Sequence, residues 1–238
     1  MHIGKVIARF VPVLVASAIA VPAQAYEQGV VAGGGTIEGR VVFNGTVTIQ
    51  KIIPTKDQEV CGDPRDEPVI RVGADKGVQS AVVYLVGIAK GKAWPPKGKT
   101  PVLDNVKCRF EPEVQVIQAG PLDVVNKDPV LHNTHGYYGK RTAFNMALPN
   151  KDQEIMTDLP RAGAVRVDCD AHGWMEAWIY VVDNPYYALT DENGKFTITD
   201  VPPGEYELVA IQSSTRPVNQ KVTVTAGKPT TLSLELKK

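Results

Sequence analysis

The sequence has 238 residues, with 26 lysine and arginine residues balanced by 26 aspartate and glutamate residues, so its formal net charge at pH 7 is zero. This balance argues against nucleic-acid binding, which requires a basic face. The length fits one large domain or two small ones, and a chain of this size can bury a hydrophobic core without several disulfides.

The first 25 residues have the pattern of a secretory signal peptide. Lys5 and Arg9 make the start positive, residues 10–21 are apolar but short for a membrane span, and Ala23-Gln-Ala25 is a small-x-small cleavage site. We predict cleavage after Ala25, with an uncleaved N-terminal anchor as the alternative. No later apolar run approaches membrane length, so we expect a protein of the periplasm, or a secreted one, without stable membrane insertion.

The remaining sequence predicts an all-β protein. Short runs rich in Val, Ile, Thr and Tyr are separated by Gly, Pro, Asn and Asp, and long helical periodicity is missing. After a flexible lead-in at residues 26–35, strands are expected at 36–43 and 81–86. Asn44-Gly45 is a hairpin-turn signal directly after the first of these strands, and a loop rich in Lys, Gly and Pro occupies residues 90–101.

Further along the chain, residues 110–128 read as two strands joined by a turn, and strands at 165–169 and 178–182 flank a short loop. We place a domain boundary near 184, which separates a domain at 91–184 from a small β-sandwich at 185–238 with regularly spaced turns. Residues 36–90 either open the first domain or supply strands to the C-terminal sandwich. The second possibility is slightly favoured and would make residues 91–184 an insertion.

Two short segments contain or adjoin every histidine that follows the signal peptide: His172 lies in one, His132 lies in the other, and His135 follows two residues after its end. The segment Cys169-Asp-Ala-His172-Gly-Trp-Met175 offers a thiolate, an imidazole and a thioether, and Asn126-Lys-Asp-Pro-Val-Leu-His132-Asn133 offers a second imidazole. Two imidazoles and a thiolate with a weak axial thioether are the ligands of copper in electron-transfer sites. Zinc is the alternative metal, but Met175 is a better ligand for copper than for zinc.

The three cysteines are Cys61, Cys108 and Cys169, and exported proteins usually pair their cysteines. If Cys169 is held as a metal thiolate, Cys61 and Cys108 are left to form a disulfide. The competing interpretation pairs Cys169 with one of the other two and leaves an odd thiol.

The two segments that contain the histidines resemble the cupredoxins, the small blue copper proteins. The Cys-x₂-His-x₂-Met loop is similar to the amicyanin type, and the Asn-x-Asp-x₃-His-Asn segment resembles the amicyanin strand with the first histidine ligand. The resemblance covers about residues 105–183. It implies a Greek-key β-sandwich with one copper ion per chain, bound by His132, Cys169, His172 and Met175. It also implies that His172, in an exposed loop, is the exit path for electrons.

Four neighbours of these ligands have two interpretations each. The Asn133 side chain either hydrogen-bonds the backbone near Cys169 or belongs to a turn. Strand alternation turns His135 away from the metal, with a second copper site or an exchange ligand as the alternative. Met146 fits a core position but is a second candidate axial ligand. Trp174 either lines a hydrophobic patch over the copper edge, where partners dock in cupredoxins, or packs in the core.

The C-terminal segment resembles the carboxypeptidase regulatory-like domain, a transthyretin-like β-sandwich that is commonly a non-catalytic accessory module. Its T-D-x-x-G-x-F…P-P-G-x-Y pattern runs from Thr190 to Tyr206, and Gly39-Arg-Val resembles the first strand of such modules. This segment contains no catalytic set.

The sequence therefore predicts an exported, mononuclear, type 1-like copper protein that transfers single electrons between redox protein partners. Only one complete set of copper ligands is found, so the protein is not expected to be an enzyme. Copper storage, delivery or resistance is an alternative, although the chain lacks a tract rich in Met and His. A non-catalytic structural sandwich is the third possibility.

Overall fold

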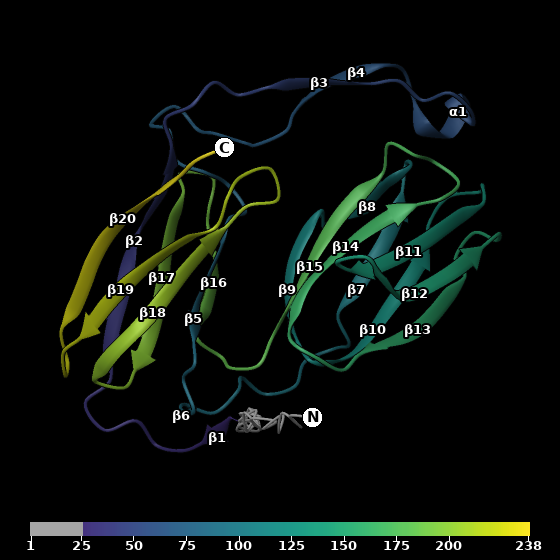
Figure 1. Ribbon diagram of the computed structural model, residues 1–238. Coiled ribbons are helices and arrows are strands. Elements are labelled where there is room, and N and C mark those ends of the chain that lie inside the picture. Colours follow the sequence, from purple (N-terminus) through teal and green to yellow (C-terminus); the bar gives the residue numbers. More distant parts are fainter. Residues whose placement is uncertain (1–25) are drawn as a thin grey trace, which may run out of the picture.

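The computed structural model describes residues 26–238, and the predicted signal peptide and its cleavage site lie outside this range. Two β-sandwiches lie side by side and are bridged at one end by a long arm (Figure 1). The described chain contains a single helix, which has four residues, so the all-β prediction is confirmed. No helix in this part of the chain is long and apolar enough to cross a membrane.

One sandwich combines strands from the two ends of the described chain. Its four-stranded sheet has the order β16-β5-β18-β19, and its three-stranded sheet has the order β17-β2-β20. The bounds are β2 (Gly35–Phe43), β5 (Val82–Val86), β16 (Tyr187–Leu189), β17 (Lys195–Val201), β18 (Gly204–Ile211), β19 (Val218–Val224) and β20 (Pro229–Leu236). Residues 35–43 and 82–86 therefore belong to the C-terminal sandwich.

Alternating side chains of these strands form the core of the C-terminal sandwich. In β2, Ile37, Val41 and Phe43 are buried, and residues between them are partly exposed. The facing sheet contributes Leu85 and Leu208 to the same hydrophobic cluster. This period of two buries one face of each sheet against the other.

The second sandwich is inserted between β5 and β16, which are antiparallel neighbours in one sheet. Its sheets have the orders β13-β10-β7-β8 and β12-β11-β14-β15-β9. The bounds are β7 (Val102–Val106), β8 (Arg109–Glu111), β9 (Val114–Gln118), β10 (Gly120–Asn126), β11 (His132–Tyr138), β12 (Arg141–Leu148), β13 (Glu154–Leu159), β14 (Gly163–Cys169) and β15 (Glu176–Val182). Short strands β1 (Glu27–Gln28) and β6 (Lys90–Gly91) pair near the entrance to this insertion.

The core of the inserted sandwich is a hydrophobic cluster separate from that of its neighbour. Leu122 and Val124 from one sheet meet Val165, Val167 and Ile179 from the other. The chain crosses between the sheets five times, after β8, β9, β10, β12 and β13. The crossing after β10 brings the segment between β10 and β11 to the end of the sandwich where the loop between β14 and β15 also lies (Figure 1).

The cap arm, residues 49–68, joins neither sandwich as a sheet strand. It consists of β3 (Ile49–Ile52), α1 (Gln58–Cys61) and β4 (Arg65–Pro68), and β3 pairs with β4. The predicted hairpin at Asn44-Gly45 is therefore wrong, because β2 pairs with β17 and β20 and the chain leaves the sheet after Phe43. The arm reaches across to the inserted sandwich, where α1 lies beside the end that contains the candidate ligands (Figure 1).

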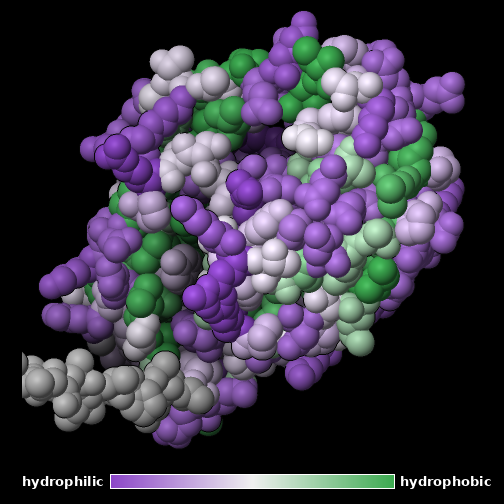
Figure 2. Space-filling model, turned by 45° about the vertical axis from the view of Figure 1, so that its right-hand side comes forward, coloured by the Kyte–Doolittle hydropathy of each residue, from purple (hydrophilic) through white to green (hydrophobic). Residues whose placement is uncertain are grey.

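A cleft of about 700 Å³ lies between the cap arm, the inserted sandwich and the turn at 213–214. Charged side chains line it, and ion pairs cross it from Arg109 to Glu67 at 2.8 Å and from Arg71 to Glu113 at 2.7 Å. Hydrophilic residues also predominate on the face of the molecule shown in Figure 2.

Thr190 provides a test of how residues 78–81 are joined to the C-terminal sandwich. Its buried hydroxyl accepts from the Ala81 amide at 2.8 Å and donates to the Val78 carbonyl at 2.6 Å. We expect Thr190→Val to lower the free energy of unfolding by about 2 kcal/mol, because both buried backbone groups lose their partner. Denaturant unfolding measures this loss, and Thr197→Val on an exposed position of β17 is the control.

Candidate metal centre

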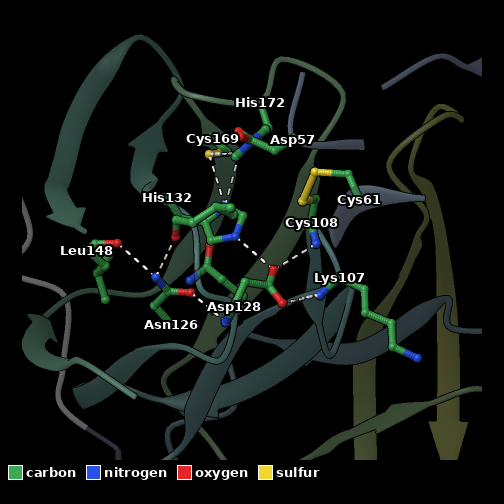
Figure 3. Close-up of polar contacts among 12 residues, drawn as sticks. Asp57, Cys61, Lys107, Cys108, Asn126, Asp128, His132, Leu148, Cys169 and His172 are labelled. Atoms are coloured by element: carbon green, nitrogen blue, oxygen red, sulfur yellow. Dashed lines mark hydrogen bonds and ion pairs between the residues drawn. A yellow bond between two sulfur atoms is a disulfide. The ribbon is translucent and has the colours of Figure 1, made fainter. Parts of the chain in front are cut away.

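Three of the four predicted ligands converge on one buried point. The Sγ atom of Cys169 lies 3.8 Å from Nδ1 of His132 and 3.7 Å from Nδ1 of His172, and the two Nδ1 atoms are 3.2 Å apart. Both histidines are fully buried, and Cys169 is 1% exposed. Figure 3 shows the two rings and the sulfur directed toward one another.

The local backbone explains this convergence. His132 is the first residue of β11, and Cys169 is the last residue of β14, which pairs with β11 so that Thr134 lies opposite Cys169. The loop then turns tightly, since the His172 amide donates to the Cys169 carbonyl and the Met175 amide donates to the His172 carbonyl. A loop of this length returns to β15 while it directs His172 back toward Cys169.

A buried carboxylate holds the outer nitrogen of His132. Oδ2 of Asp128 lies 2.9 Å from Nε2 of His132 and also accepts from the Cys108 amide at 2.9 Å. Its other oxygen accepts from the Lys107 amide at 2.7 Å. Lys107 and Cys108 both have positive φ, at the two-residue turn between β7 and β8, which aims these amides at Asp128.

Asn126 shapes the segment that carries Asp128 and His132. Its side-chain amide donates to the carbonyls of Val130 and Leu148, and its Oδ1 accepts from the Asp128 amide at 2.9 Å. Asn126 is fully buried, so these hydrogen bonds fix the short crossing between β10 and β11.

The outer nitrogen of His172 also meets a carboxylate, from the cap arm. Oδ2 of Asp57 lies 3.0 Å from Nε2 of His172 (Figure 3). The expectation that His172 occupies an exposed loop is wrong: its side chain is 0% exposed because the arm covers it.

The two carboxylates decide which ring nitrogens face the centre as acceptors. A carboxylate accepts, so Nε2 of each imidazole donates its hydrogen to Asp57 or Asp128, and Nδ1 is the nitrogen whose lone pair faces the centre when the ring is in its neutral form. Two lone pairs then face each other at 3.2 Å in a buried site, and the single thiol hydrogen of Cys169 can satisfy one of them at most. A cation satisfies both.

Burial also shifts the pKa of two of the candidate ligands, His132 and Cys169. It lowers the pKa of His132, which favours the neutral ring, and the Asp128 hydrogen bond opposes this effect. Burial raises the pKa of the Cys169 thiol, while hydrogen bonds from nearby backbone amides oppose the shift. A metal ion would displace the thiol proton, because a coordinating thiol is deprotonated.

The donor set fits a copper or zinc ion of ordinary bond length. Metal–nitrogen and metal–sulfur bonds of about 2.0 and 2.3 Å would place one ion within reach of three atoms with these separations. Met175 is buried in the same hydrophobic cluster as Cys169 and follows His172 in the loop. Its thioether as axial ligand stays a prediction, and it favours copper over zinc.

The neighbours of the ligands differ partly from their predictions. The Asn133 side chain does not make the predicted hydrogen bond, since its Oδ1 is buried without a partner in the described structure. Its backbone ties the segments instead, because the amide approaches Cys169 Sγ at 3.5 Å and the carbonyl accepts from the Asp170 amide at 3.0 Å. The backbone of Asn133 thus makes the link to the Cys169 segment that was predicted for its side chain.

His135 lies on the face of β11 opposite to His132, as strand alternation predicts. Its ring stacks on Tyr137 with centroids 4.0 Å apart and contacts Asp170 at 3.0 Å and Thr142 at 2.9 Å. The His135 ring therefore interacts with Tyr137, Asp170 and Thr142 near the surface, and not with Cys169.

Met146 and Trp174 are both half-buried against the core of the inserted sandwich. Trp174 stands edge-on to His172 with ring centroids 5.1 Å apart and lines the cleft. It therefore packs beside the ligand ring under the arm.

Sequence reasoning missed both carboxylates. Asp128 stands four residues before His132, a local spacing that could have been noticed. Asp57 is 115 residues from His172, and only the disulfide gave a signal for its position. That disulfide is confirmed: Cys61 and Cys108 are bonded, with a sequence separation of 47, and Cys169 is free.

Comparison with known proteins supports the C-terminal assignment. Residues 163–237 match the family model of the carboxypeptidase regulatory-like domain, which confirms the resemblance carried by the pattern at 190–206. The matched range also includes β14 and β15 of the inserted sandwich. No curated protein matches the sequence.

Similar solved structures are found for part of the chain. Amicyanin from Paracoccus versutus (Thiobacillus versutus) is 21% identical, over 36% of this chain and 84% of its own, with a TM-score of 0.33. A copper-containing nitrite reductase from Thermus scotoductus is 17% identical, over 39% of this chain and 24% of its own, with a TM-score of 0.32.

Proposed function

We propose that this protein is an exported mononuclear copper protein that transfers single electrons, with His132, Cys169, His172 and Met175 as copper ligands. The observation that carries the proposal is the buried meeting of two imidazole Nδ1 atoms and one thiol sulfur within 3.8 Å of one another. Copper bound there would supply a one-electron couple between its two oxidation states.

The residues of this chain contribute rigidity and exclusion of water. Asp57 and Asp128 hold the outer nitrogens of the two rings, so the imidazoles keep one orientation in both oxidation states. The buried cluster around Cys169 keeps solvent from its sulfur. A site that changes little between states suits electron transfer to a protein partner better than catalysis, so we propose no enzymatic activity.

The burial of the site also bears on copper handling, the alternative function. A protein that stores or delivers copper must release it readily, whereas both imidazoles here are fully buried. We therefore favour electron transfer, in the periplasm or outside the cell, as the predicted signal peptide implies.

Cys169→Ala tests the proposal directly. After one equivalent of Cu²⁺ is added to the mature protein, we expect an intense visible thiolate-to-copper band with a matching EPR signal, and we expect Cys169→Ala to abolish the band. His135→Ala is the matched control, because its ring lies on the opposite face of β11, and it should keep the band. Weak, colourless binding that persists in Cys169→Ala would reject the electron-transfer site.

A further inference from the structure

The cap arm is anchored to the inserted sandwich at several points near the candidate centre. The Cys61–Cys108 disulfide joins α1 to the turn between β7 and β8. Glu67 of β4 pairs with Arg109 at 2.8 Å, and Val60 packs against the core of the inserted sandwich. Just after the arm, Ser214 donates to the Val69 carbonyl at 2.9 Å. All of these contacts follow Asp57 in the chain, and β3, on the other side of Asp57, is held through its pairing with β4.

The disulfide also lies against the candidate ligands. The sulfurs of Cys61 and Cys108 and a ring nitrogen of His172 all lie within 4.8 Å of one another, as do the Cys108 sulfur, an Asp128 oxygen and a His132 nitrogen. Figure 3 shows the disulfide beside both rings. One covalent link thus fixes the arm next to the turn whose amides hold Asp128.

Asp57 has a backbone conformation that frees its carboxylate. It is the N-cap residue of α1, but its side chain makes no capping hydrogen bond, although Asp at this position usually caps the first turn. Its φ is 52°, in the left-handed region that Asp adopts more readily than most residues. The carboxylate is directed to Nε2 of His172 instead.

We propose that the cap arm, residues 49–68, closes the His172 side of the copper centre, with Asp57 as a positioning residue for the His172 imidazole. This inference rests on the proposed copper site. The arm covers the His172 ring, and the hydrogen bond between His172 and Asp57 fixes the orientation of that ring. A partner protein then cannot contact the His172 ring edge while the arm is in place, and bound copper exchanges slowly.

The first test uses copper transfer from the reduced holoprotein to a Cu(I) chelator, bathocuproine disulfonate. We expect Asp57→Gly to accelerate the transfer about tenfold, and glycine accepts the positive φ without added strain. Asp57→Asn keeps an acceptor oxygen and should transfer copper at nearly the wild-type rate. Asp200→Gly, an exposed aspartate with φ of 55° in the other sandwich, is the control and should change nothing.

The reduction potential separates the positioning role from general loosening. Both Asp57→Gly and Asp57→Asn remove a negative charge near the copper, so both should raise the potential, whereas only Asp57→Gly should accelerate transfer. Wild-type transfer rates and potentials in Asp57→Gly would overturn the proposal. An Asp57→Asn variant that transfers copper as fast as Asp57→Gly would overturn the positioning role.

A second test needs no copper. Diethyl pyrocarbonate modifies accessible histidines, and peptide mass spectrometry of the apoprotein should find His172 protected in the wild type and modified faster in Asp57→Gly, with His135 as the internal reference. Equal reactivity of His172 in both proteins would overturn the cap. Absence of the thiolate-to-copper band in the wild type would reject the copper site alone, since the protection of His172 is measured independently.

Discussion

Asp128→Ala is expected to lower the free energy of unfolding of the apoprotein by about 4 kcal/mol. The Asp128 carboxylate is 6% exposed and accepts hydrogen bonds from the Lys107 and Cys108 amides and from His132. The substitution leaves three donors of the buried region without an acceptor. Denaturant unfolding followed by tryptophan fluorescence measures the loss.

The same substitution should weaken copper binding roughly 10- to 100-fold, because the His132 ring loses the group that orients it. Competition with a chelator of known affinity gives this number. Asp158→Ala removes an exposed carboxylate from β13 and serves as the control. If Asp128→Ala matched Asp158→Ala in both measurements, the role assigned to Asp128 would be wrong.

The approach of His172 to Cys169 could be predicted because its determinants are local. The spacing of Cys169, His172 and Met175 closes one short loop, and strand alternation places His135 away from His132. The disulfide between Cys61 and Cys108 followed from treating Cys169 as a metal thiolate. In each case the inference needed only neighbouring positions or a count of cysteines.

The arm could not be predicted, because its contacts depend on the path of the chain between the sandwiches. Asn44-Gly45 has the composition of a hairpin turn, yet β2 finds its partners in β17 and β20, more than 150 residues away. A local turn signal says nothing about which strands are available for pairing. Once β2 is paired on both sides, the chain after Phe43 must leave the sheet.

The prediction that His172 is exposed was wrong for the same reason, because it depended on the path of a distant part of the chain. A tight loop between two strands ordinarily projects from the end of a sandwich, and the resemblance to cupredoxins reinforced that expectation. Here a segment that precedes the loop by more than 100 residues covers the ring with Asp57. The loop has the predicted form, but its surroundings come from another part of the chain.

Removal of the disulfide, by Cys61→Ala with Cys108→Ala, is expected to destabilise the protein by about 4 kcal/mol in the chain-entropy model, given a closed loop of roughly 48 residues. Alanine avoids burying a new hydroxyl at these sites, where Cys61 is 5% exposed and Cys108 is 0% exposed. Urea unfolding of both proteins without reductant measures the difference. A decrease of less than about 1 kcal/mol in the free energy of unfolding would mean that the other contacts of the arm hold it in place without the disulfide.

The double variant also tests whether the disulfide and Asp57 act together. If the disulfide holds Asp57 in place, the arm of the double alanine variant is already loose, and adding Asp57→Gly should accelerate copper transfer far less than it does in the wild-type background. Contacting or connected groups show such non-additive effects, whereas independent sites add. Full additivity of the two rate changes would show that Asp57 reaches His172 without the tether, and that the remaining contacts of the arm, such as Glu67 with Arg109, position it.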